Sequence, residues 1–178
     1  MRWKFPVPKQ IFSSPAVKDG VVYVHVRDDQ VYALDARDGN VLWKTPAPAP
    51  QEWWNLVFMD PSKSSPAVAG DRVFVGIDRN LTALDRRTGR VLWQAPTGRK
   101  VDSTPLAVGD VVYVGSDDRT FYAFEAATGK KIWSYATGGR VSSSPTFGEG
   151  LILIGSDDGA LYAFEPEERG RPAGGSRP

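Results

Sequence analysis

The sequence predicts an all-β protein made of four repeats of about 40 residues, each expected to fold into a four-stranded antiparallel sheet. Three regularities predict this fold. A Ser-Pro or Thr-Pro step occurs four times, an apolar run ends nine residues after each proline, and an acidic residue follows ten or eleven residues further on. A tryptophan stands eight residues after the first three of these acidic residues. The steps are Ser14-Pro15, Ser65-Pro66, Thr104-Pro105 and Ser144-Pro145. Four short strands per unit of this length are typical of a β-propeller blade.

The first repeat illustrates the four strands in order. The first strand is expected at 15–17, because a proline at the start of a strand costs no ladder hydrogen bond. The second, at 21–24, is apolar without alternation, which indicates burial on both faces. The third, at 31–34, follows a polar turn, and the fourth ends at Trp43.

The turn between the third and fourth strands ends in glycine in each repeat that has a fourth strand. Glycine suits the left-handed position that closes a three-residue hairpin with a bulge. These glycines, Gly39, Gly89 and Gly129, and the tryptophans, Trp43, Trp93 and Trp133, are therefore predicted to be structural.

The two ends of the chain complement each other. The last repeat stops at Glu165 without a tryptophan strand, whereas the chain begins with an isolated one, Arg2-Trp3-Lys4-Phe5. We expect the Trp3 strand to complete the fourth blade, so that residues 1–165 form a closed four-bladed propeller. Two alternatives are half of an eight-bladed ring made by two chains, and a fragment of a longer propeller. Residues 166–178 have no apolar periodicity and are expected to form a disordered tail or linker.

Composition excludes several classes of function. Of the 178 residues 41% are hydrophobic, and the net charge of +1 comes from interspersed basic and acidic residues. Nothing therefore suggests nucleic acid as a partner. The apolar runs are too short for membrane insertion. The chain has no cysteine, which rules out disulfides and thiol chemistry. Residues 1–6 show no secretory signal, so we expect a cytoplasmic protein or a piece of a longer exported chain.

The repeated polar residues are expected to be structural. Paired aspartates recur in one turn and single acidic residues in another, and such symmetric repetition is typical of residues that stabilise hairpin turns. They are Asp28/Asp29, Asp117/Asp118 and Asp157/Asp158, and Asp35, Asp85, Glu125 and Glu165. His25 is the single histidine and is expected to be a packing residue, and no base accompanies the hydroxyls before each proline. We therefore predict no catalytic residue, no metal site and no cofactor.

The main break in the symmetry is the connection Thr45–Pro61, which is eleven residues longer than its counterparts. It carries Trp53, Trp54, Phe58 and Met59, residue types that anchor protein interfaces. It is expected beside the mouth of the channel, either as a binding loop or as a plug over its own channel.

The second repeat closely resembles the tryptophan-docking motif of the pyrroloquinoline-quinone-type propeller repeat family. Ala83, Asp85, Thr88, Gly89 and Trp93 match the motif, and the other copies depart from it in having glutamate for the aspartate or aspartate for the threonine. The resemblance covers roughly residues 1 to 165. It implies that each tryptophan packs between adjacent blades.

The same resemblance also suggests several functions. The family, mostly periplasmic or cell-surface bacterial proteins, includes quinoprotein dehydrogenases, the outer-membrane assembly lipoprotein B, and sensor or adhesion modules. The dehydrogenases use vicinal cysteines and a calcium site, which this sequence does not show, so membership does not imply quinone chemistry. We expect a non-enzymatic scaffold for protein–protein interaction. The alternatives are a quinone or other small-ligand module without catalytic residues, and a structural spacer in a larger surface or kinase-linked protein. A protein partner is expected, and a homodimer is possible.

Overall fold

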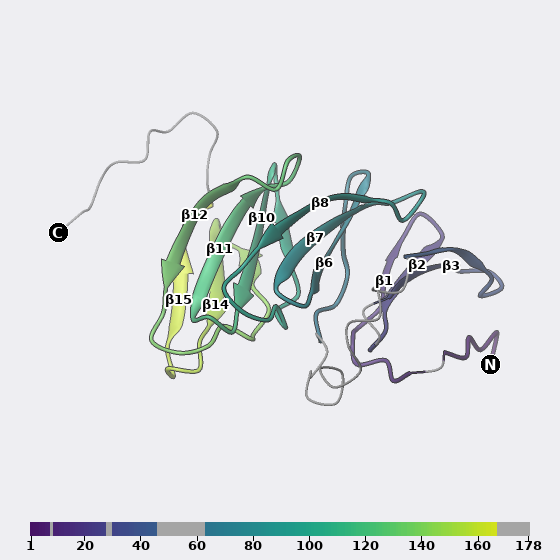
Figure 1. Cartoon of the computed structure of the whole chain (residues 1–178), viewed down its shortest axis with the longest axis horizontal. Helices are drawn as coiled ribbons and strands as arrows, with labels where there is room; N and C mark the ends of the chain where they lie inside the picture. Colours follow the sequence, from purple (N-terminus) through teal and green to yellow (C-terminus); the bar gives the residue numbers. More distant parts are fainter. Residues whose placement is uncertain (8, 28–29, 46–62, 167–178) are drawn as a thin grey trace, which may run out of the picture.

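The computed structural model describes residues 1–7, 9–27, 30–45 and 63–166. These residues form four antiparallel sheets arranged as successive blades, and they contain no helix long and apolar enough to cross a membrane (Figure 1). The all-β prediction is therefore confirmed.

The strands follow one another in the blades as they do in the sequence. Blade 1 contains β1 (Ala16–Lys18), β2 (Val21–His25), β3 (Val31–Asp35) and β4 (Val41–Lys44). Blade 2 contains β5 (Ala67–Ala69), β6 (Arg72–Ile77), β7 (Asn80–Asp85) and β8 (Val91–Pro96). Blade 3 contains β9 (Leu106–Val108), β10 (Val111–Ser116), β11 (Thr120–Glu125) and β12 (Lys131–Ala136). Blade 4 contains β13 (Thr146–Gly148), β14 (Leu151–Gly155) and β15 (Leu161–Phe164).

The hydrophobic core lies between the blades, because the second and third strands of each blade alternate their side chains between two neighbours. Between blades 1 and 2 the buried residues are Tyr23, Val31, Ala33, Val73, Val75 and Leu84. Between blades 2 and 3 they include Phe74, Leu81, Val112, Val114 and Phe124. Between blades 3 and 4 they include Tyr113, Phe121, Ile152 and Ile154. This two-sided burial explains why these strands lack an alternating pattern in the sequence.

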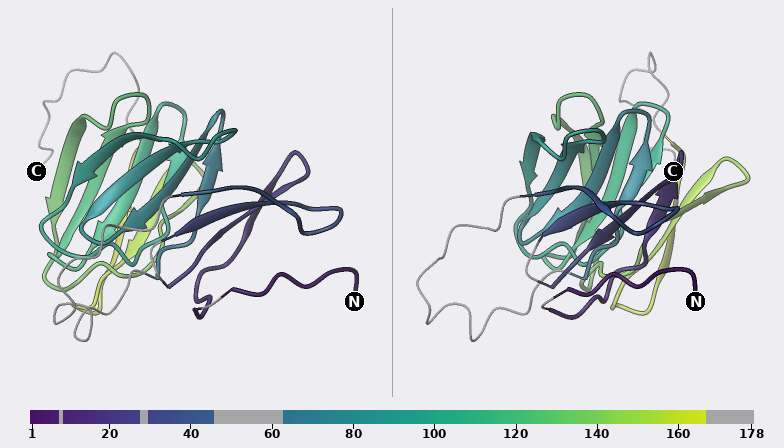
Figure 2. Two further views of the ribbon diagram at one scale, coloured as in Figure 1. Left: turned by 45° about the vertical axis from the view of Figure 1, so that its right-hand side comes forward. Right: turned by 90° about the vertical axis from the view of Figure 1, so that its right-hand side faces the viewer.

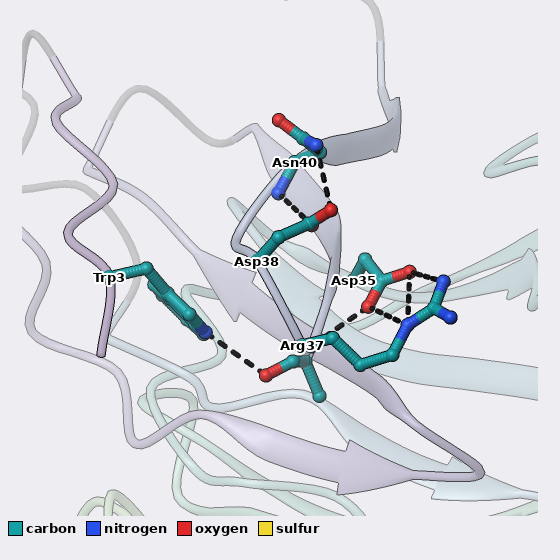
Figure 3. A network of polar contacts seen from close by, with 6 residues as sticks. Trp3, Asp35, Arg37, Asp38 and Asn40 are labelled. Carbon is teal, nitrogen blue, oxygen red and sulfur yellow. Dashed lines mark hydrogen bonds and ion pairs between the residues drawn. The ribbon is translucent and has the colours of Figure 1, made fainter.

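A tryptophan from each of three outer segments docks on the hairpin turn of the following blade. The indole Nε1 of Trp43 donates a hydrogen bond of 2.9 Å to the carbonyl oxygen of Arg86, and that of Trp93 donates one of 3.1 Å to Ala126. Trp3 repeats the contact at the carbonyl oxygen of Ala36, at 3.0 Å (Figure 3). Each of these tryptophans thus joins two segments of the chain across a blade interface.

The turn glycines are needed for two reasons. Gly39, Gly89 and Gly129 have φ angles of +77°, +71° and +74°, which disfavour side chains with a Cβ. A Cβ at any of the three would also lie closer than 3.0 Å to the docked indole ring. The glycine therefore lets the indole lie directly against the backbone of the turn.

The blades form an open arc, and the structure does not confirm that the Trp3 strand closes a ring. In the described part of the chain, residues 2–5 form no strand, the sheet of blade 4 has three strands, and its outer strand β15 pairs with β14 alone. Figures 1 and 2 place the N-terminal segment beside blade 1, at the opposite end of the arc from β15. There Trp3, Phe5 and Val7 pack on the apolar face of blade 1. Docking of Trp3 requires only the turn of blade 1, so the motif does not determine which sheet edge pairs with its backbone.

Replacing Gly89 by alanine should destabilise the protein by about 2–4 kcal/mol, roughly 1 from the left-handed backbone and roughly 1–3 from the clash with Trp43. Gly109→Ala is the matched control, because Gly109 has a φ of +58° but open space around its Cβ position. It should cost only about 1 kcal/mol. Chemical denaturation measures both, and equal losses would contradict the docking role.

Truncation of Trp93 to alanine should reduce the free energy of unfolding by about 3–5 kcal/mol, because a large aromatic group leaves an inter-blade core. The control is Val91→Ala on the same strand, where the side chain is 46% exposed. That change should cost less than about 0.5 kcal/mol. A loss at Trp93 no larger than the loss at Val91 would refute the assignment.

Candidate functional site: the charged mouth

The Ser/Thr-Pro steps lie side by side along the inner side of the arc, where neighbouring first strands contact each other. The backbone N–H of Ser14 donates to Ser65 Oγ at 2.8 Å, that of Ser65 to Thr104 Oγ1 at 3.2 Å, and that of Thr104 to Ser144 Oγ at 3.0 Å. These hydroxyls therefore join successive blades at their inner ends, as the tryptophans join them at the outer ends.

The hydroxyls one residue earlier bind the second strand of their own blade. Ser13 Oγ donates to the carbonyl oxygen of His25 at 2.8 Å and accepts from its N–H at 3.2 Å, and Ser143 does the same with Gly155. His25 is 2% exposed, and its Nδ1 lies 2.8 Å from the carbonyl oxygen of Ser64. Both groups therefore have structural contacts in the described part of the chain.

The second aspartate of each described pair fastens its turn. Asp118 accepts hydrogen bonds from the N–H of Gly98 at 2.6 Å, the hydroxyl of Tyr122 at 2.6 Å and the N–H of Thr120 at 2.9 Å. Asp158 makes the equivalent three bonds in blade 4. The Tyr162 hydroxyl, followed by a backbone N–H, holds the pKa of Asp158 below its usual value. The predicted turn role holds for these two residues, while Asp28 and Asp29 lie outside the described residues.

The acidic residues after the third strands of blades 1 and 2 are bound within their own hairpins. Arg37 pairs with Asp35 at 2.7 Å, and this contact lowers the pKa of Asp35 to about 2 (Figure 3). Asp85 accepts from the hydroxyl of Thr88 at 2.8 Å, and this bond lowers its pKa. Asp35 and Asp85 thus each serve their own turn.

The first aspartate of each pair has a different position. Asp117 and Asp157 line a hollow of about 350 Å³ between blades 2, 3 and 4, which we call the charged mouth. Its lining is Lys63, Asp102, Asp117, Arg140, Ser142 and Asp157. Three of these residues, Lys63, Asp102 and Ser142, stand two positions before the Ser/Thr-Pro dipeptide of their repeat.

Charges of both signs meet in the charged mouth. Asp102 accepts from the backbone N–H of Lys63 at 2.8 Å and pairs with Lys100 Nζ at 3.0 Å. Burial, together with the neighbouring Asp102 carboxylate, raises the pKa of Asp117, and this outweighs the opposite effect of Arg140 and Lys100. The arrangement can therefore receive a ligand that carries both positive and negative groups.

The residues at this hollow also differ from one repeat to the next. At the equivalent positions blade 1 has Phe12 and Arg27, and the guanidinium of Arg27 lies 5.7 Å from the centre of the Phe12 ring. Sequence reasoning treated each aspartate pair as one turn device and missed Asp117 and Asp157. The signal that could have found them is the residue before the repeated serine, which changes in every repeat while its neighbours recur.

The predicted binding residues Trp53, Trp54, Phe58 and Met59 lie outside the described residues. The structure describes only where their connection ends. It returns to the described chain at Lys63, one of the lining residues of the charged mouth. Within the described part of the chain, no group of three or more His, Cys, Asp or Glu side chains is placed to hold a metal ion.

Comparison with known proteins identifies the family and the fold. A family model described as outer membrane protein assembly factor BamB matches residues 1–104 and 77–172. Among curated proteins, none matches the sequence significantly. BamB from Moraxella catarrhalis superposes with a TM-score of 0.75 at 24% identity, covering 92% of this chain and 49% of that chain. This chain thus spans about half the length of that BamB.

Two other solved structures share the fold. The computationally designed Ika4 protein superposes with a TM-score of 0.76 at 14% identity, covering 93% of this chain and 97% of that chain. Quinohemoprotein alcohol dehydrogenase from Comamonas testosteroni gives 0.70 at 22% identity, covering 83% of this chain and 29% of that chain. At these identities the likeness concerns the fold.

Replacing either of the two neighbouring aspartates of blade 3 by alanine should affect the free energy of unfolding differently. Asp118→Ala removes three hydrogen bonds and should lower the free energy of unfolding by about 1–3 kcal/mol. Asp117→Ala removes a carboxylate whose ionised form is disfavoured by the fold, because its pKa is raised relative to the unfolded chain. This cost begins as the pH rises past the ordinary aspartate pKa of the unfolded chain, so at pH 7 Asp117→Ala should leave stability unchanged or increased. Urea unfolding at pH 7 measures both, and a loss at Asp117 equal to that at Asp118 would contradict the distinction.

Proposed function

The chain belongs to the propeller family of outer membrane protein assembly factor BamB, and we propose that it is a non-enzymatic scaffold that binds a protein partner at the charged mouth. The observation that carries this proposal is the non-repeating set of charged residues in that hollow. The repeated polar groups described above are bound within turns or between blades, whereas this set differs from blade to blade.

The chemistry of the charged mouth suits a segment of polypeptide. Lys63 and Arg140 can bind carboxylates or backbone carbonyl groups, while Asp117 and Asp157 can bind basic side chains or N–H groups. The connection that ends at Lys63 contains Trp53, Trp54, Phe58 and Met59, which would add apolar anchors beside the charges. We propose that these two parts form one binding surface.

The family suggests the kind of partner. The matching model is named for a factor in the assembly of outer membrane proteins. We therefore propose that the partner is a protein of such an assembly process, and that the scaffold positions this partner without chemical conversion.

Photocrosslinking in the cells that produce the protein tests the proposal. A photoreactive amino acid in place of Ser142 should form one discrete covalent adduct with another protein. The same amino acid in place of Val91, which is exposed on an outer strand, should not form that adduct. Adding Asp117→Lys and Arg140→Glu to the Ser142 variant should abolish it by reversing two charges. Failure to form an adduct at Ser142, or equal adducts at both positions, would refute a partner at the charged mouth.

The size of the hollow also admits an alternative, binding of a quinone or another small ligand. Addition of pyrroloquinoline quinone with calcium separates the two functions. We expect no change in the melting temperature. An increase that Arg140→Glu removes would favour the ligand-binding function over the protein scaffold.

A further inference from the structure

The face of blade 4 that points away from blade 3 is apolar and uncovered by the described residues. Leu161 on this face is 71% exposed, and Leu151, at the other end of the same face, is exposed as well. The residues equivalent to Leu161 in the other blades are fully buried by the following blade: Val31, Leu81 and Phe121 are each 0% exposed. Blade 4 therefore presents the surface that every other blade uses to bind its successor.

The outer edge of the same blade also lacks its usual partner. In blades 1 to 3 a fourth strand pairs with the third, with a tryptophan opposite an alanine: Ala33 with Trp43, Ala83 with Trp93, and Ala123 with Trp133. Blade 4 has the alanine, Ala163, on an edge strand with no fourth strand beside it among the described residues.

The N-terminal segment has the complementary properties. Trp3 docks on blade 1 with the geometry of a fourth-strand tryptophan, and residues 2–5 are not part of any sheet. It thus has the side-chain contact of a fourth strand without the backbone pairing. One chain contains both halves of a blade contact, the edge at β15 and the strand at residues 2–5.

These halves lie at opposite ends of the open arc (Figures 1 and 2). The arc also superposes on about half of the BamB chain from Moraxella catarrhalis, covering 49% of it. A second copy placed head to tail can therefore supply the strand for each β15 and continue the same curvature. An arrangement in which two identical contacts close a ring satisfies both ends of both chains.

We propose that two copies of this chain join head to tail into a ring of eight blades, in which residues 2–5 of each copy pair with β15 of the other. By the register of the other blades, Ala163 lies opposite the partner's Trp3, and Tyr162 opposite the partner's Lys4. Leu151 and Leu161 become buried between blade 4 and blade 1 of the second copy. This inference does not depend on what the charged mouth binds.

Light scattering after size-exclusion chromatography tests the stoichiometry. The 178-residue chain should have a mass of about 39 kDa at micromolar concentration, twice the 19.5 kDa of one chain. Leu161→Asp should dissociate it to 19.5 kDa with its circular dichroism retained, because Leu161 is exposed in the single arc. Val91→Asp is the control, since Val91 stays 46% exposed although blade 2 has a neighbour on each side, and it should remain a dimer. A wild-type mass of one chain, or a mass that rises without limit with concentration, would overturn the proposal.

Disulfide trapping tests the register, because the native chain has no cysteine. Mixing the Lys4→Cys and Tyr162→Cys variants under oxidation should give a covalent dimer, and neither variant alone should do so. Arg2→Cys mixed with Tyr162→Cys is the out-of-register control and should crosslink at least tenfold less. In the double variant Lys4→Cys/Tyr162→Cys, a crosslink confined to one chain would show a four-bladed ring that closes by itself and would refute the dimer.

Discussion

The structure depends on the contact of an indole ring with a glycine that has no side chain. Trp43 lies against the turn at Gly89 and donates its N–H to a carbonyl oxygen of the same turn. A close contact and a directed hydrogen bond together determine both the distance and the rotation between two blades. Trp93 repeats this contact between blades 2 and 3, so these two interfaces have the same geometry, and Trp3 makes the same contact with the turn of blade 1.

The sequence alone predicts most of this arrangement, because each part of the contact leaves a local pattern. A left-handed position in a turn favours glycine, and strands buried on both faces lack the alternation of polar and apolar residues. The tryptophan recurs at a constant distance from the acidic residue. These patterns predicted the strands of blades 1 to 3, which the structure confirms. They also predicted a structural role for Gly39, Gly89 and Gly129, whose backbones lie against the docked indole rings. They are reliable because each depends on residues close together in the chain.

Features that depend on distant residues could not be predicted in the same way. The pattern around Trp3 identifies a fourth strand that docks on the next blade, and it does so in the structure. The pattern contains no information about which sheet edge pairs with that strand, because the edge is about 160 residues away and its pairing depends on the curvature summed over every interface. The charged mouth has the same origin, since its lining residues come from three blades and appear unrelated until the fold assembles them.

The two neighbouring aspartates of the same turn have different surroundings. Asp118 and Asp158 each accept three hydrogen bonds that fasten their turns. Burial and a neighbouring carboxylate disfavour the charge of Asp117, whose side chain lines the charged mouth. A group that the fold disfavours is more readily explained by binding than by folding. Tryptophans join the blades at their outer ends, and hydroxyl groups join them at their inner ends. The residues of the charged mouth can therefore vary without disturbing the interfaces that hold the arc together.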